Sequence, residues 1–259
     1  MHYRESLPSS GLSHLVLSFW EFAVSETVLG PHYHYVFPDG CTLLSYCGKS
    51  MRLAPGLKVI GPTIRSRVIP VWPGEVWWGV RLQPAAVQAV TGCAPCILRD
   101  RAEACAVINP ELDRALLCAL EGSKCFADAV IAYEQVLGTH LRQQIDGKVA
   151  AAAHFIDNTG GRAKIEEVAL AVGLSERQLQ RRFNQAVGLT PKQFARVRRL
   201  RSTTVAMLGR ELTDWAGLAA EAGYSDQSHL THELNALTGH LPTSFERRVR
   251  RIEHGFLRR

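Results

Sequence analysis

The chain has 259 residues, enough for about two domains of ordinary size. Hydrophobic residues make up 46% and charged residues 21%, a globular composition that excludes a disordered or collagen-like chain. No apolar run approaches the roughly 20 residues needed to cross a bilayer, and the N-terminal residues lack the pattern of a secretion signal. We therefore expect a cytoplasmic protein without membrane contact, and the odd count of 7 cysteines agrees with a reducing compartment.

The formal net charge of +6 is unevenly distributed along the chain. Residues 1–144 hold 12 basic and 12 acidic residues, whereas residues 145–259 hold 18 basic and 12 acidic ones. All the cysteines and four of the five tryptophans lie in the first part. We expect two domains, 1–144 and 145–259, and the basic second domain is the candidate for binding a polyanion.

The first domain begins with short aromatic or β-branched runs that are separated by Gly and Pro turns. These runs cover residues 15–23, 32–37, 41–47, 57–61, 65–72 and 76–83. They predict an antiparallel barrel or sandwich. From residue 84 the apolar spacing becomes helical, over 84–91, 111–121 and 126–144. The expected fold class is therefore α+β, with a β-rich first domain that has C-terminal helices of its own.

Two features of this domain invite a metal hypothesis. Cys93-Ala-Pro-Cys96 is a lone CxxC motif, for which Cys105 would be a third ligand of the four that structural zinc needs. Cysteines without special chemistry are favoured over a metal or thiol sensor. His32 and His34 share one face of a strand, but solvent-facing histidines are favoured over a metal pair. We expect no metal and no cofactor.

A third feature of the first domain is its set of large aromatic residues. These are Phe19, Trp20, Phe22, Trp72, Trp77 and Trp78. Such residues line small-molecule pockets, and they also fill ordinary cores. The sequence leaves both alternatives open.

The second domain contains an internal repeat. Ala169 and Gly173 correspond to Ala219 and Gly223 at an offset of 50 residues. Downstream the offset is 51 for five successive pairs, which are Leu179 with Leu230, Phe183 with Leu234, Gly188 with Gly239, Pro191 with Pro242 and Phe194 with Phe245. This regularity indicates a duplication with one residue inserted in the second turn.

Each copy has the pattern of a helix-turn-helix motif. The small alanine lets two helices approach, and the glycine permits the tight turn between them. Ser175 and Asp226 are expected to cap the helix after each turn. In the first copy Leu179 and Phe183 face inward, so the outer face carries Glu176, Arg177, Gln180 and Arg181.

A long basic helix is expected to join the two copies. Gly188 suits the end of one helix, Thr190-Pro191 suits the start of the next, and that helix extends to about Leu208. Its arginines are Arg196, Arg198, Arg199 and Arg201. Plain helical bundles also contain such helices, but two copies in the half that carries all the excess charge favour nucleic acid as the partner.

Residues 148–253 resemble the DNA-binding domain of AraC/XylS-type transcription regulators. The resemblance is carried by LSERQLQRRFNQAVGLTPKQFARVRRLR and LAAEAGYSDQSHLTHELNALTGHLPTSF. The first half resembles, more weakly, a β-rich domain of uncharacterised function that precedes this region in some such regulators. Its matching segments are Phe37-Pro-Asp-Gly-Cys41 and Gly79-Val-Arg-Leu-Gln-Pro84.

The resemblance implies two recognition helices in successive major grooves of double-stranded DNA. The positions that match base-contacting residues of the family are Arg177, Gln180 and Arg181 in the first helix and Gln227, Ser228 and His232 in the second. The candidates for phosphate contacts are Thr190, Lys192, Arg196 and Arg199. The position of His232 usually carries Arg or Lys in the family, and that of Leu234 carries Phe. We therefore expect the first repeat to dominate affinity.

The expected function is sequence-specific transcription regulation, with RNA polymerase as a further partner, and the family favours activation. Residues 1–144 would sense a small-molecule effector or form a homodimer. Helices at 111–144 either supply the dimer surface or pack on their own sheet, and the two alternatives are equally favoured.

An enzyme fused to the DNA-binding module is a further alternative with weaker support. The sequence has no nucleophile elbow, phosphate loop or zinc-protease motif. The residues that only the fold could assemble into a site are His14, His32, Asp39 and Glu75.

Overall fold

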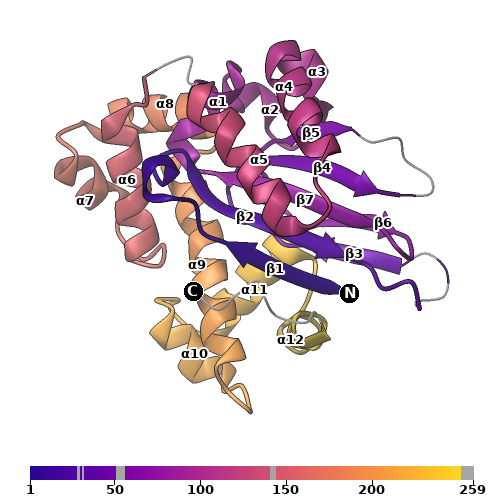
Figure 1. Cartoon of the computed structure of the whole chain (residues 1–259). Coiled ribbons are helices and arrows are strands. Elements are labelled where there is room, and N and C mark those ends of the chain that lie inside the picture. The colour runs from indigo at the N-terminus through magenta and orange to yellow at the C-terminus, as the bar shows by residue number, and fades with distance from the viewer. Residues whose placement is uncertain (28–29, 31, 51–55, 141–143, 252–259) are drawn as a thin grey trace.

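The computed structural model describes residues 1–27, 30, 32–50, 56–140 and 144–251 (Figure 1). Six strands of the N-terminal domain form one antiparallel sheet. Their order across the sheet is β1 (His2–Ser6), β2 (Val16–Ala23), β7 (Val76–Leu82), β4 (Leu43–Lys49), β5 (Leu57–Ile60) and β8 (Ala102–Ala104). A separate antiparallel ribbon pairs β3 (His32–Val36) with β6 (Arg67–Val71). All six predicted strands are present, whereas β1 and β8 were not predicted.

Two helices cover one face of the sheet, namely α4 (Pro110–Glu121) and α5 (Phe126–Thr139). Leu112, Leu116 and Tyr133 are fully buried in one cluster with the sheet residues Leu44 and Val80. The apolar stripes of these helices therefore pack on their own sheet, which was one of the two alternatives. The predicted helix over 126–144 ends at Thr139, and residues 141–143 lie outside the described part of the chain.

The β3–β6 ribbon covers the opposite face, so the strands form a sandwich-like arrangement. Trp20, Phe22 and Val71 form a small buried cluster there, and Trp77 packs against it. Phe19 and Trp78 belong instead to the core under the helices. Phe19, Trp20, Phe22, Trp77 and Trp78 of the predicted aromatic set thus divide between two cores because alternate residues of a strand point to opposite faces, whereas Trp72 belongs to neither core.

His34 contradicts the expectation that both histidines of β3 face solvent. Its ring lies 4.4 Å from that of Phe22, centroid to centroid, whereas His32 is exposed. Burial lowers the pKa of His34 to about 4, and the N-terminal ammonium contributes to the shift. The expectation is wrong for His34 because its side chain packs on Phe22 of the six-stranded sheet, which the ribbon covers.

Five short helices lie between the strands of the sheet domain or directly before α4. They are η1 (Ser10–Leu12), η2 (Pro84–Ala86), α1 (Val87–Thr91), α2 (Pro95–Leu98) and α3 (Cys105–Ile108). The C-terminal half is helical, with α6 (Gly147–Asn158), α7 (Ile165–Ala171), α8 (Glu176–Val187), α9 (Pro191–Leu208), α10 (Trp215–Glu221), α11 (Gln227–Thr238) and α12 (Pro242–Arg251). Among the described residues, no helix combines the length and hydrophobicity that crossing a membrane requires.

The internal repeat corresponds to two separate hydrophobic cores that share α9. Leu179 and Phe183 are buried in the first core, and their counterparts Leu230 and Leu234 are buried in the second. Helix α9 supplies Phe194 to the first core and Met207 to the second. The α+β fold class with two helix-turn-helix units and a linker helix is therefore confirmed.

Gly79 is required where β7 passes under Trp20. The two residues are opposite each other in the sheet, and a Cβ at Gly79 would lie 2.3 Å from Cζ2 of the indole. We expect Gly79→Ala to lower the free energy of unfolding by about 3 kcal/mol because Trp20 must leave its position. Gly138→Ala, in the last turn of α5 with nothing within 4 Å of the added Cβ, is the control and should gain at most about 0.5–1 kcal/mol. Equal stability of the two variants in urea unfolding would contradict this account.

The environment of His34 predicts a pH-dependent stability. Because its folded pKa is lowered, the unfolded chain binds a proton that the folded chain does not, between about pH 6.5 and pH 4. Stability is therefore complete above this window, and up to about 3 kcal/mol is lost as the pH falls through it. His34→Asn, which cannot titrate, should lose less stability than wild type between pH 7 and pH 4. Parallel losses in urea unfolding would rule out His34 as the cause.

Candidate nucleic-acid interface

The two tight turns set the direction of the helices that follow them. Gly173 has φ +63° and Gly223 has φ +75°, a left-handed conformation that residues with side chains rarely adopt. Ser175 accepts a hydrogen bond from the Gln178 N–H at 3.3 Å, and Asp226 accepts one from the His229 N–H at 2.7 Å. Both predicted caps are present, and they fix the first turns of α8 and α11.

Helix α8 presents the predicted base-contacting residues to solvent. Arg177, Gln180 and Arg181 are exposed, whereas Leu179 and Phe183 are fully buried. No carboxylate in the described part of the chain pairs with either arginine, so both guanidinium groups can meet an external anion. Arg182, by contrast, binds both carboxylate oxygens of Asp146, at 2.8 and 2.7 Å.

Helix α11 presents a more weakly charged surface. Gln227, Ser228 and His232 are exposed, as predicted from their counterparts in the first repeat. The neighbouring Glu233 binds Arg196 of α9, with Nε and Oε1 3.1 Å apart, and its second oxygen lies 3.6 Å from His229. The only candidate groups that this face offers to bases are therefore uncharged or weakly basic side chains.

The four predicted phosphate ligands differ in their surroundings. Lys192 is exposed, and Thr190 caps α9 by accepting a hydrogen bond from the Gln193 N–H at 3.2 Å. Arg196 forms the ion pair with Glu233. Arg199 donates to the Gly161 carbonyl at 3.0 Å, and its guanidinium lies 5.3 Å from the ring centre of Tyr224. Both arginines thus have partners within the protein.

Sequence reasoning missed Arg247, although the repeat could have found it. The offset of 51 residues that pairs Phe194 with Phe245 also pairs Arg196 with Arg247. Arg247 is exposed on α12, and no acidic partner faces it within the described residues. The second unit therefore has a free guanidinium where the first unit has one engaged in an ion pair.

Buried charges join the sheet domain to the linker helix. Asp39 Oδ2 lies 2.7 Å from Nε of the fully buried Arg81, and the Asp39 carbonyl accepts a hydrogen bond from Arg198 at 3.1 Å. Arg198 also binds the carboxylate of Asp157 at 2.8 Å. Burial alone would raise the pKa of Asp39, but Arg81, the Cys41 N–H and Arg198 together outweigh that effect and hold the pKa below its usual value. The linker helix therefore uses Arg198 for packing.

The cysteines do not form a metal centre within the described residues, where no three His, Cys, Asp or Glu side chains come together as ligands. Cys93 is half-buried, Cys96 is exposed and Cys105 is fully buried. Burial raises the pKa of Cys93, and it raises that of Cys105 to about 12. Both thiols are thus disfavoured as thiolates, the form that binds metals and reacts with oxidants.

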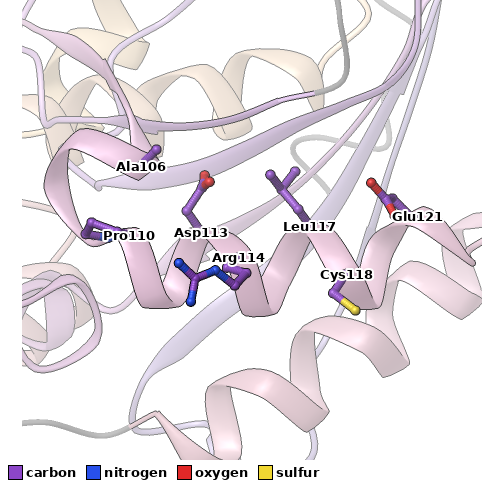
Figure 2. A pocket seen from close by; sticks show the side chains of 7 residues that line it. All are labelled: Ala106, Pro110, Asp113, Arg114, Leu117, Cys118 and Glu121. Carbon is purple, nitrogen blue, oxygen red and sulfur yellow. The ribbon is translucent and has the colours of Figure 1, made fainter.

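A shallow cavity of about 400 Å³ lies on the outer side of α4 (Figure 2). It is lined by Ala106, Pro110, Asp113, Arg114, Leu117, Cys118 and Glu121. None of the predicted pocket aromatics contributes to it.

Two family models match separate parts of the chain. Residues 168–248 match the family described as "Helix-turn-helix domain", and residues 4–103 match the family described as "Domain of unknown function (DUF6597)". A search of curated proteins found no match.

Among solved structures, the chain is similar to the ToxT protein of Vibrio cholerae. One ToxT crystal structure shares 8% identity with a TM-score of 0.46, and the match covers 89% of this chain and 98% of ToxT. A ToxT structure bound to an unsaturated fatty acid shares 8% identity with a TM-score of 0.42, over 87% of this chain and 93% of ToxT. At this level the likeness concerns the fold alone.

The duplicated units and their caps agree with the two family matches. The chain contains an N-terminal domain of the family of unknown function, at residues 4–103, and a C-terminal helix-turn-helix domain of the AraC type, at residues 168–248.

Proposed function

We propose that the chain is a sequence-specific regulator of transcription that binds double-stranded DNA through residues 145–259. The observation that carries the proposal is the outer face of α8, where Arg177, Gln180 and Arg181 are exposed and the two arginines have no acidic partner among the described residues. Arg recognises guanine through two hydrogen bonds, and Gln recognises adenine in the same way. Helix α11 contributes Gln227, Ser228 and His232.

Phosphate contacts divide between the two units in this proposal. Lys192 and Thr190 lie at the start of α9, and Arg247 lies in the middle of α12, at the position that corresponds to Arg196. Arg196 and Arg199 contribute only if DNA displaces their internal partners, Glu233 and the Gly161 carbonyl. We therefore rank Lys192 and Arg247 above these two arginines.

Residues 1–144 would bias DNA binding through their contact with the linker helix. An effector molecule, or self-association into a homodimer, acts only if it favours one arrangement of the two domains over another. In this proposal the contact between Asp39 and Arg198 couples the arrangement of the sheet domain to the position of α9. We further propose that the protein activates transcription in the cytoplasm by contacting RNA polymerase. The AraC-type helix-turn-helix domain supports a role in transcription.

Binding that involves phosphates must weaken with salt. We expect the full chain to bind a duplex enriched from a random pool, with an affinity that falls steeply between 50 and 200 mM salt. Titration of a labelled duplex at several salt concentrations measures this dependence. The absence of salt-sensitive binding to every duplex would overturn the proposed function.

The two repeats should contribute unequally to affinity. Arg181→Ala should weaken binding to the enriched duplex by about 10- to 100-fold, because it removes an unpaired guanidinium from the base-contacting face. His232→Ala should weaken binding by less than about threefold, because it removes an imidazole and not a guanidinium, whose fork of N–H donors matches guanine and phosphate. Arg114→Ala, on α4, controls for the loss of one exposed positive charge. Equal losses for the first two variants, or a larger loss for His232→Ala, would contradict the ranking.

A further inference from the structure

One loop of the sheet domain lies between the two helix-turn-helix units. Residues Gly61–Ser66 connect β5 to β6, and Ile64 packs against the cores of both units. Figure 1 shows α8 near the upper end of α9 and α11 lower down beside it, with the sheet domain alongside. The loop therefore contacts both halves of the DNA-binding domain at once.

The contact with the first unit is at the C-terminal end of its recognition helix. Gly188 ends α8 with φ +80° and is buried. A Cβ at this position would lie 2.9 Å from Cγ of Pro62 and 2.7 Å from the carbonyl oxygen of Pro95. The backbone of the recognition helix thus approaches the sheet domain more closely than any residue with a side chain allows.

The contact with the second unit is at the equivalent end of the other recognition helix. The Ser66 N–H donates a hydrogen bond to the Leu237 carbonyl at 2.8 Å. Leu237 lies in the last turn of α11, where carbonyl groups have no partner within the helix. The loop therefore supplies a donor that the helix end requires.

The loop is held rigidly between these two contacts. The Gly61 N–H donates to the Arg101 carbonyl at 2.9 Å, and the Asp100 N–H donates to the Pro62 carbonyl at 3.1 Å. Thr63 Oγ1 donates to the Arg65 carbonyl at 3.0 Å. The first two bonds fix the loop to the segment that joins α2 and β8, and the third closes a turn within the loop.

A second loop of the sheet domain reinforces the arrangement. The rings of Phe37 and Phe245 meet edge to face at 5.1 Å, and Gly40 lies against the ring of Phe194. Phe245 belongs to the second core and Phe194 to the first. Both units are thus anchored to the same domain at two places each.

We propose that the Gly61–Ser66 loop sets the separation of the two recognition helices and thereby selects the spacing of the DNA half-sites that the chain binds. The proposal rests on the proposed function. Linker helix α9 alone would join the two units, but the loop adds a further connection between them. The added connection restricts bending and rotation of one unit relative to the other. The sheet domain then determines specificity without touching a base.

The test compares spacing profiles of paired glycine variants. A duplex enriched by the full chain is altered so that the two half-sites move apart or together by one to three base pairs. Gly188→Ala and Gly239→Ala replace equivalent C-terminal glycines with φ +80° and +74°, but nothing lies within 4 Å of a Cβ at Gly239. Both variants carry the same backbone strain, but only Gly188→Ala places a methyl group against Pro62 of the loop and the Pro95 carbonyl of α2, to which the loop is bonded through the segment after α2.

Wild type and Gly239→Ala should lose about tenfold or more in affinity when the spacing changes by two base pairs, since each base pair adds rotation as well as distance. Gly188→Ala should lose less than about threefold over the same change. Ser66→Pro, which removes the N–H bonded to Leu237, should flatten the profile in the same way, and Ser66→Ala, which keeps this N–H, should not. This second pair tests the proposal if Gly188→Ala fails to fold.

The possible results distinguish a failure of this inference from a failure of the proposed function. Salt-sensitive binding with superimposable spacing profiles for wild type, Gly188→Ala and Ser66→Pro would overturn the inference and leave the proposed function intact. An affinity of wild type that does not change with half-site spacing would also overturn the inference and leave the proposed function intact. No binding by wild type to any duplex would overturn the proposed function, and the inference with it.

Discussion

The close approach of the sheet domain to the ends of both recognition helices is the constraint on which this structure depends. A helix-turn-helix unit orients its own recognition helix through a glycine turn and a capped N-terminus, as at Gly173 and Ser175. Those local features say nothing about the other unit. The relation between α8 and α11 comes from α9 and from the loop around Ile64, so the geometry presented to DNA is a property of the whole chain.

The arginines of the C-terminal half are divided between the interior and the surface. The excess positive charge of this half is therefore larger than the charge available on its candidate DNA-binding face. Arg198 is buried and binds Asp157 and Asp39, and Arg199 holds the Gly161 carbonyl. These groups stabilise the packing of the linker helix. Arg177 and Arg181, which have no acidic partner among the described residues, lie on the outer face of α8. A charge-based argument finds the correct half of the chain, but only the packing separates the two roles.

The sequence predicted the repeat, both turns and both caps, because glycine conformation and capping act over a few residues. It predicted six strands because short aromatic or β-branched runs between Gly and Pro turns are also a local pattern. It missed β1, which is mostly polar and pairs only with β2, and β8, which has three residues. It placed His34 in solvent because the ribbon that covers Phe22 forms through pairing of β3 with the distant β6. The ion pair of Arg196 with Glu233 was likewise invisible, since the two residues meet only when α9 packs on α11.

Hydroxyl-radical footprinting of the full chain on its enriched duplex tests the central claim most directly. Two recognition helices held at a fixed separation must enter the major groove from one side. The account predicts two protected windows on the same face of the duplex, about one helical turn or 10–10.5 base pairs apart. A single protected window, or two windows on opposite faces, would contradict it.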